Sequence, residues 1–172
     1  SLYTSKDRTV LFAVNHQGGR NTIEIFDVES DRLLHLKTIS DPALVSPNDL
    51  VAVGKDKFYV TNDHRFSSGI KRTVEEYFRL KISNVLFYSG SGFVEAASGI
   101  GYANGVNVSA DGSVLYVAAT IGRSLHVYDR NTATNEIVLK EKIKLDSGVD
   151  NIEIDSSGGI WIGAHPKLLS FV

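Results

Sequence analysis

The stretch that decides the fold is Asn104-Gly-Val-Asn-Val-Ser-Ala-Asp-Gly-Ser-Val-Leu-Tyr-Val-Ala118. It contains an asparagine, a short apolar run, an Asp-Gly turn and a second apolar run that ends in a small residue. The same order recurs at residues 48–61 and 151–163, at intervals of roughly 50 residues. Repeats of this length with several short strands each are typical of the blades of a β-propeller.

The rest of the chain also consists mainly of short runs rich in β-branched and aromatic residues, separated by Gly, Asn, Asp and Ser. The predicted strands are residues 9–14, 22–28, 33–39, 50–53, 58–61, 85–88, 106–108, 114–118, 124–128, 152–154 and 160–162. We therefore predict an all-β fold in which residues 1–172 form one partial β-propeller, with about three complete blades and pieces at each end.

The two ends of the chain carry the incomplete blades in this interpretation. Residues 9–16 would supply the second strand of a blade whose first strand lies upstream. An incomplete ring exposes unpaired strand edges. We therefore expect the chain to be a fragment of a longer protein, or to complete its ring with another molecule.

Residues 70–83 break the strand pattern, because their apolar residues recur at steps of three and four among charged residues. The apolar positions are Ile70, Val74, Tyr77, Phe78 and Ile82. This spacing predicts one amphipathic helix inserted between strands. The helix would either pack on the edge of the sheet or form a lid over a ligand site.

Composition and charge exclude some classes of function. Of the 172 residues 42% are hydrophobic, which is enough to form a folded core. The formal net charge of -2 gives no electrostatic reason to expect nucleic acid as a partner. The sequence has no cysteine and no Gly-x-Ser-x-Gly, Walker or zinc-binding motif, so serine-hydrolase and nucleotide chemistry are unsupported.

The repeated asparagine marks a candidate metal site. Equivalent positions in propeller blades converge on the central channel, so Asn48, Asn104 and Asn151 would surround one axis, with Asp49 and Asp150 beside them. An asparagine before a strand can also merely cap a turn. Three asparagines in register favour instead a ring of oxygen ligands, which suits calcium better than magnesium.

Several segments, in this order, resemble the paraoxonase/arylesterase family over nearly the whole chain. They are Asn48-Asp-Leu-Val-Ala-Val-Gly, Phe58-Tyr-Val-Thr-Asn-Asp-His64, Ala103-Asn-Gly-Val-Asn-Val, Val149-Asp-Asn-Ile and Trp161-Ile-Gly-Ala-His-Pro166. The resemblance implies a six-bladed propeller with two calcium ions in its central tunnel. It also implies a lid helix that takes part in association with a lipid or membrane surface, and a location outside the cell or at a membrane.

The resemblance also implies roles for single residues. Asn48, Asn104, Asp150 and Asn151 match ligands of a catalytic calcium, and Asp49 matches a ligand of a structural one. His16 matches a histidine that handles protons during hydrolysis. Two further histidines, His64 and His165, match positions that line the mouth of the substrate pocket.

The chain departs from the family pattern in ways that affect both metal sites. The acidic pair and the His-Gly-hydrophobic tripeptide that the family places near its N-terminus do not occur in this sequence. Asp150 would then be the one carboxylate at the catalytic calcium, which weakens calcium binding. Ala164 stands where the family has a free cysteine.

The function that we expect from these residues is calcium-dependent hydrolysis of small hydrophobic lactones and aryl esters, with His16 activating water. A gluconolactonase-like calcium hydrolase is the nearest alternative, because such propellers also place Asn and Asp on calcium. A catalytically inactive propeller that acts as an interaction scaffold is the alternative from another class.

Overall fold

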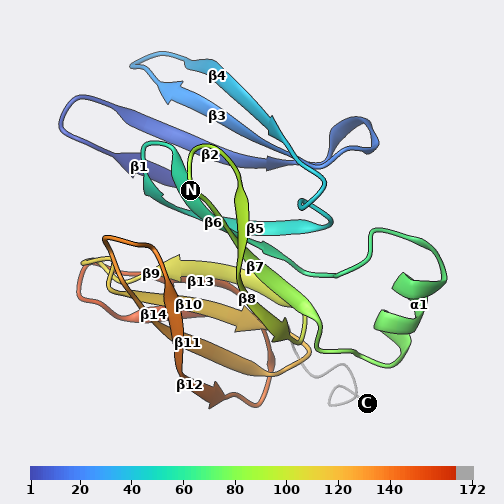
Figure 1. Ribbon diagram of the computed structural model, residues 1–172. Coiled ribbons are helices and arrows are strands. Elements are labelled where there is room, and N and C mark those ends of the chain that lie inside the picture. Colours follow the sequence, from blue (N-terminus) through green and yellow to red (C-terminus); the bar gives the residue numbers. More distant parts are fainter. Residues whose placement is uncertain (166–172) are drawn as a thin grey trace.

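The computed structural model describes residues 1–165, and most of these residues lie in antiparallel strands (Figure 1). Three sheets have four strands each, in chain order. They are β1 (Leu2–Thr4), β2 (Thr9–Asn15), β3 (Thr22–Val28) and β4 (Leu33–Ser40); β5 (Pro47–Gly54), β6 (Lys57–Asn62), β7 (Ser83–Tyr88) and β8 (Phe93–Ile100); and β9 (Ala103–Val108), β10 (Val114–Ala119), β11 (Ser124–Arg130) and β12 (Ile137–Lys144). A further sheet pairs β13 (Gly148–Ile154) with β14 (Ile160–His165).

These sheets are propeller blades. The first strands of successive blades pack against one another, with β9 between β5 and β13. Two helical segments interrupt the strands: the 3-10 turn η1 (Gln17–Gly19), and α1 (Gly69–Tyr77) between β6 and β7. No helix in the described part of the chain has the length and apolar character needed to cross a membrane.

Strand β6 shows how the core is built between neighbouring blades. Phe58 and Val60 pack with the apolar side chains of the first blade, whereas Tyr59 between them packs with those of the third. Side chains alternate across a strand, so a strand covered on both sides must be apolar at successive positions. The run Phe58-Tyr-Val is for this reason buried on both faces of its sheet.

The predicted propeller of about three complete blades is confirmed, with two differences in its strands. The blade predicted to be incomplete at the N-terminal end has all four strands, because β1, which lies upstream of residues 9–16, pairs with β2 through Leu2 and Leu11. The sequence also gave no prediction for the outer strands β8 and β12. Most of their residues are exposed or only partly buried, so they carry no clear alternation of apolar and polar residues.

The inserted helix is present but shorter than the predicted range of 70–83. It ends at Tyr77, because Arg79 adopts a left-handed conformation with a φ of 50°. Packing on the edge of the sheet, one of the two expected arrangements, does not fit Ile70 and Tyr77, which are 84% and 81% exposed. The other arrangement, a lid over a ligand site, stays a prediction. The buried residue of α1 is Glu75.

Gly105 sets the distance between the inner strands β9 and β13. A Cβ atom at this position would lie 2.4 Å from the main-chain oxygen of Asp150 and 2.8 Å from the Cα of Asn151. Both contacts involve backbone atoms, which cannot rotate away as the end of a flexible side chain can. Glycine is therefore required here by close packing of two strands.

The first prediction concerns Gly105→Ala, which should lower the free energy of unfolding by about 1–3 kcal/mol or more, because the added methyl group overpacks the contact with β13. The matched control is Gly92→Ala, since a Cβ at Gly92 meets no atom within 4 Å. Chemical denaturation of both variants measures the difference. Equal stabilities of the two variants would contradict the assigned contact.

Candidate metal centre

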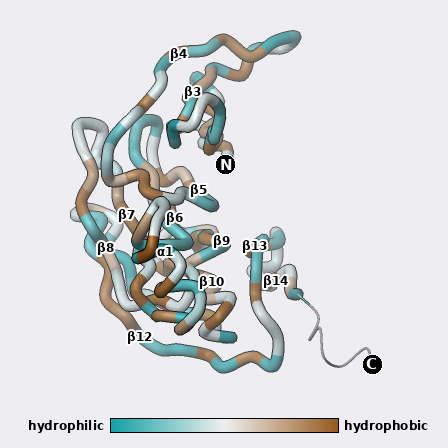
Figure 2. The backbone as a smooth tube through the Cα atoms, turned by 90° about the vertical axis from the view of Figure 1, so that its right-hand side faces the viewer, coloured by the Kyte–Doolittle hydropathy of each residue, from teal (hydrophilic) through white to brown (hydrophobic). Residues whose placement is uncertain are grey.

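All the residues predicted to form the site lie on one face of the blades. Strand direction alternates within each blade, so first strands begin on the same face on which second strands end. The site residues near strand starts are Asn48, Asp49, Asn104, Asp150 and Asn151, and those at strand ends are His16, His64 and His165. Figure 2 looks toward the side of the molecule that carries α1.

Asn104 is the most deeply buried member of the predicted ring, with 5% of its surface exposed. Its main-chain oxygen accepts a hydrogen bond of 2.6 Å from the Thr61 hydroxyl, and its Nδ2 donates to Thr120 Oγ1 at 3.2 Å. These contacts fix the amide, yet its Oδ1 is buried without a hydrogen-bond partner among the described residues. An unsatisfied buried acceptor costs about 1–3 kcal/mol, so this oxygen lacks a donor or a cation.

Asn48 is oriented by Asp63, a residue to which the sequence analysis assigned no role. Asn48 Nδ2 donates to Asp63 Oδ2 at 3.3 Å, so the carbonyl oxygen of the Asn48 amide is left for another ligand. Burial raises the pKa of Asp63, but hydrogen bonds from Ser46 and His64 outweigh burial and hold its pKa below the usual value. Asp63 is therefore an anionic acceptor that fixes the Asn48 amide.

Asp150 and Asn151 lie near the start of β13. Asp150 Oδ2 lies 2.9 Å from His165 Nε2, while Asn151 is exposed. Thr120 connects this strand to the third blade, because the hydroxyl that accepts from Asn104 donates to the Val149 carbonyl at 2.7 Å. Hydrogen bonds thus run from Asn104 to the strand that carries Asp150.

Asp49 ties β5 to β9. Its Oδ2 accepts from the main-chain N–H of Val106 at 2.9 Å, and its Oδ1 accepts from its neighbour Leu50 at 2.8 Å. Burial raises the pKa of Asp49 despite these two hydrogen bonds. The carboxylate therefore holds two inner strands together at the position predicted to bind a structural calcium.

His64 is enclosed beside the predicted ring. It is 5% exposed, and its Nδ1 contacts Asp63 Oδ1 at 2.6 Å while its Nε2 lies 3.6 Å from Glu76 Oε1. The ring of Tyr102 meets it edge-on at a centroid distance of 4.8 Å. The imidazole thus connects the loop after β6 to α1.

His16 lies apart from the other predicted residues. It is exposed after β2, where its Nδ1 lies 2.9 Å from Asn21 Oδ1. Asn21 is itself fixed, because its Nδ2 donates to the main-chain oxygens of Leu44 and Val45. No hydrogen bond or ion pair within residues 1–165 joins His16 to the asparagines of the ring.

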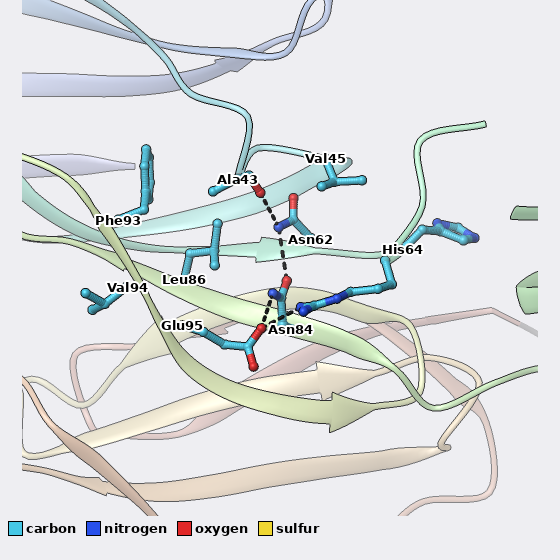
Figure 3. Close-up of a pocket in the computed structure, with 10 residues that line it drawn as sticks. Ala43, Val45, Asn62, His64, Asn84, Leu86, Phe93, Val94 and Glu95 are labelled. Atoms are coloured by element: carbon cyan, nitrogen blue, oxygen red, sulfur yellow. Dashed lines mark hydrogen bonds and ion pairs between the residues drawn. The ribbon is translucent and has the colours of Figure 1, made fainter. Parts of the chain in front are cut away.

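A cavity of about 360 Å³ lies beside this face, between the segment before β5 and the strands of the second blade (Figure 3). Ala43, Leu86 and Phe93 supply part of its apolar lining. A row of hydrogen bonds joins Asn62 to Asn84 and Asn84 to Glu95. The cavity adjoins the site through His64 and is not lined by the asparagines of the ring.

The donor set fits a hard cation. The predicted ligands offer amide and carboxylate oxygens, which calcium prefers, and the buried Asn104 Oδ1 is left without any other partner among the described residues. Within residues 1–165 no group of three or more His, Cys, Asp or Glu could hold a metal ion, so a cation at this face would depend on the amide oxygens of asparagine. Pro166, which completes the His-Pro dipeptide, lies outside the described residues.

Solved structures share the propeller fold. The luciferin-regenerating enzyme covers 95% of this chain at a TM-score of 0.62 and 16% identity, and the match spans 53% of that protein. Regucalcin, a calcium-binding protein from Agrobacterium tumefaciens, covers 95% at a TM-score of 0.60 and 14% identity, over 52% of its own length. At such identities the likeness concerns the fold alone.

The chain is also similar in sequence to curated proteins at much higher identity. Human serum paraoxonase/arylesterase 2 is 44% identical over 171 residues, and human serum paraoxonase/arylesterase 1 is 38% identical over the same length. Both matches cover 97% of this chain and 48% of the relative, so the chain spans about half the length of these proteins. The family profile described as Arylesterase matches residues 1–172, and the chain belongs to the arylesterase family.

Proposed function

We propose that the protein containing this chain is a calcium-dependent hydrolase of small hydrophobic lactones and aryl esters. The observation that carries the proposal is the buried Asn104 Oδ1, an oxygen without a partner among the described residues at the centre of an oxygen-rich face. Membership of the arylesterase family and the names of the relatives support the ester class of substrate.

The proposed ligands of the catalytic calcium are Asn48, Asn104, Asp150 and Asn151. Asp49 is the proposed ligand of a second, structural calcium, because each of its oxygens has a lone pair beyond the hydrogen bond that it accepts. When bound, calcium supplies a Lewis acid for a carbonyl oxygen of the substrate. Thr120 and Asp63 hold the Asn104 and Asn48 amides in place.

His16 is the proposed general base, and its neighbours support the tautomer that this role needs. Both contacts of Asn21 Nδ2 are with carbonyl oxygens, so Asn21 Oδ1 faces His16 as an acceptor. The Nδ1 of His16 must then carry the proton, and Nε2 keeps its lone pair. A neutral imidazole with a free Nε2 can accept a proton from water at neutral pH.

The remaining predicted residues belong to the entrance of the site. His64 and His165 are the proposed substrate-lining residues, and α1 beside them is the proposed lid. The exposed Ile70 and Tyr77 of α1 support association with a lipid or membrane surface. The word serum in the names of the relatives supports an extracellular location.

A calcium titration of Asn104→Ala tests the metal site. The variant should lose at least half of the rise in melting temperature that calcium gives the natural protein, because the buried acceptor is removed. In excess chelator the stability of the variant should stay close to that of the natural protein, because removing the Asn104 side chain also removes the cost of its unsatisfied oxygen.

Asn107→Ala is the matched control on the same strand. Its Nδ2 donates to the Ile152 oxygen and its Oδ1 accepts from Val108, so its amide is already satisfied. This control should lose stability equally with calcium and with chelator. The same pattern in Asn104→Ala would count against a cation at Asn104.

Replacing Asn21 with leucine tests the proposed base. The variant frees the His16 ring to adopt the wrong tautomer, so kcat for a lactone should fall at least about tenfold while KM changes little. Steady-state kinetics with the natural protein and the variant would measure the fall. An unchanged kcat would remove His16 from the proton transfer.

A further inference from the structure

Helix α1 is held to the molecule in an unusual way. Its nine residues are too few for independent stability in water, and Ser68 at its N-terminus makes no capping hydrogen bond through its side chain. Its apolar residues Ile70 and Tyr77 face solvent. Neither intrinsic helix stability nor apolar packing accounts for its position.

The buried contact that holds α1 is made by Glu75, which is 3% exposed, and the partly exposed Arg72 adds a hydrogen bond of 3.2 Å from its Nη1 to the Phe66 main-chain oxygen. The Oε1 of Glu75 accepts from the main-chain N–H of Arg65 at 2.9 Å, and its Oε2 accepts from Arg65 and Phe66 at 3.1 and 3.2 Å. Hydrogen bonds to a charged acceptor are stronger than those between neutral groups, and in a buried position they are costly to lose. Glu75 thus ties the helix to the loop that follows β6.

That loop carries the groups nearest to the predicted ring. His64 directly precedes the main-chain N–H groups that Glu75 binds. Glu76, the next residue of the helix, places its Oε1 3.6 Å from the Nε2 of His64. On its other side the imidazole contacts Asp63, which holds Asn48. A continuous set of contacts therefore runs from α1 to a proposed calcium ligand.

We propose that Glu75 is a positioning residue for the hydrolysis, because its carboxylate fixes His64 and α1 beside the predicted metal ring. The proposal rests on the proposed function for its effect on catalysis. It explains why a carboxylate is the buried residue of α1. A shorter side chain at this position would leave the N–H groups of Arg65 and Phe66 without their acceptor, and a glutamine would keep only one of the two acceptor oxygens.

The first arm of the test uses trypsin on the natural protein and on Glu75→Ala, Glu75→Gln and Glu141→Gln. The segment contains Arg65, Lys71, Arg72 and Arg79, which are cleavage sites. Loss of the carboxylate should raise cleavage within residues 65–79 about tenfold in Glu75→Ala, and less in Glu75→Gln, which keeps one acceptor oxygen. Glu141 is exposed on β12, so its variant should match the natural protein.

The second arm compares two substrates, a long-chain lactone and a small aryl ester. The longer chain of the lactone is the part expected to reach α1, so kcat/KM should fall about tenfold for the lactone and much less for the ester. Global destabilisation would lower both values by the same factor. The ratio of kcat/KM for the lactone to kcat/KM for the ester is independent of the amount of active protein.

Unchanged trypsin cleavage in Glu75→Ala would overturn the proposal, as would equal losses on the two substrates. If the natural protein hydrolyses neither substrate, the proposed function fails, and the trypsin arm alone decides whether Glu75 holds α1. Faster cleavage together with a selective loss on the lactone is the result that we expect.

Discussion

The close approach of the inner strands β5, β9 and β13 is the constraint on which the rest of the structure depends. Gly105 permits β9 to touch the backbone of β13, and Asp49 binds a backbone N–H of β9 from the side of β5. Strands at this distance cannot place large side chains between them. Small and polar residues take these positions, and the large apolar residues pack farther out, between the blades.

This arrangement also explains why the predicted metal site is rich in oxygen atoms. The main-chain N–H of Asp49 donates to Thr61, and the side-chain amides of Asn104 and Asn48 donate to Thr120 and Asp63. These bonds use up donors at the strand starts and leave acceptors available. Asn104 Oδ1 is the clearest case, because it is buried and without a partner within residues 1–165. A cation at this position would give this oxygen the partner that the neighbouring side chains do not supply.

Much of the fold could be predicted from the sequence, because blades repeat and buried strands have a simple alternation. The convergence of the asparagines at one metal site stays a prediction. The strand register makes Asp150, rather than Asn151, the equivalent of Asn48 and Asn104, which the repeat pattern alone did not reveal. The part played by Asp63 could not be predicted, because its contacts join loops that are distant in sequence. The orientation of α1 could not be predicted from the spacing of its apolar residues either. That spacing implies that the apolar side chains are buried, whereas Glu75 is the buried residue of the helix.

The glycine that allows β9 and β13 to touch has a chemical consequence as well. Asn104 and Gly105 form the one Asn-Gly dipeptide in the sequence. In this pair the following main-chain nitrogen meets little steric hindrance when it attacks the side-chain amide, with loss of ammonia. Close packing requires the glycine and the proposed metal site requires the asparagine, so a dipeptide prone to deamidation lies between two inner strands. Its durability depends on the order of the strand that contains it.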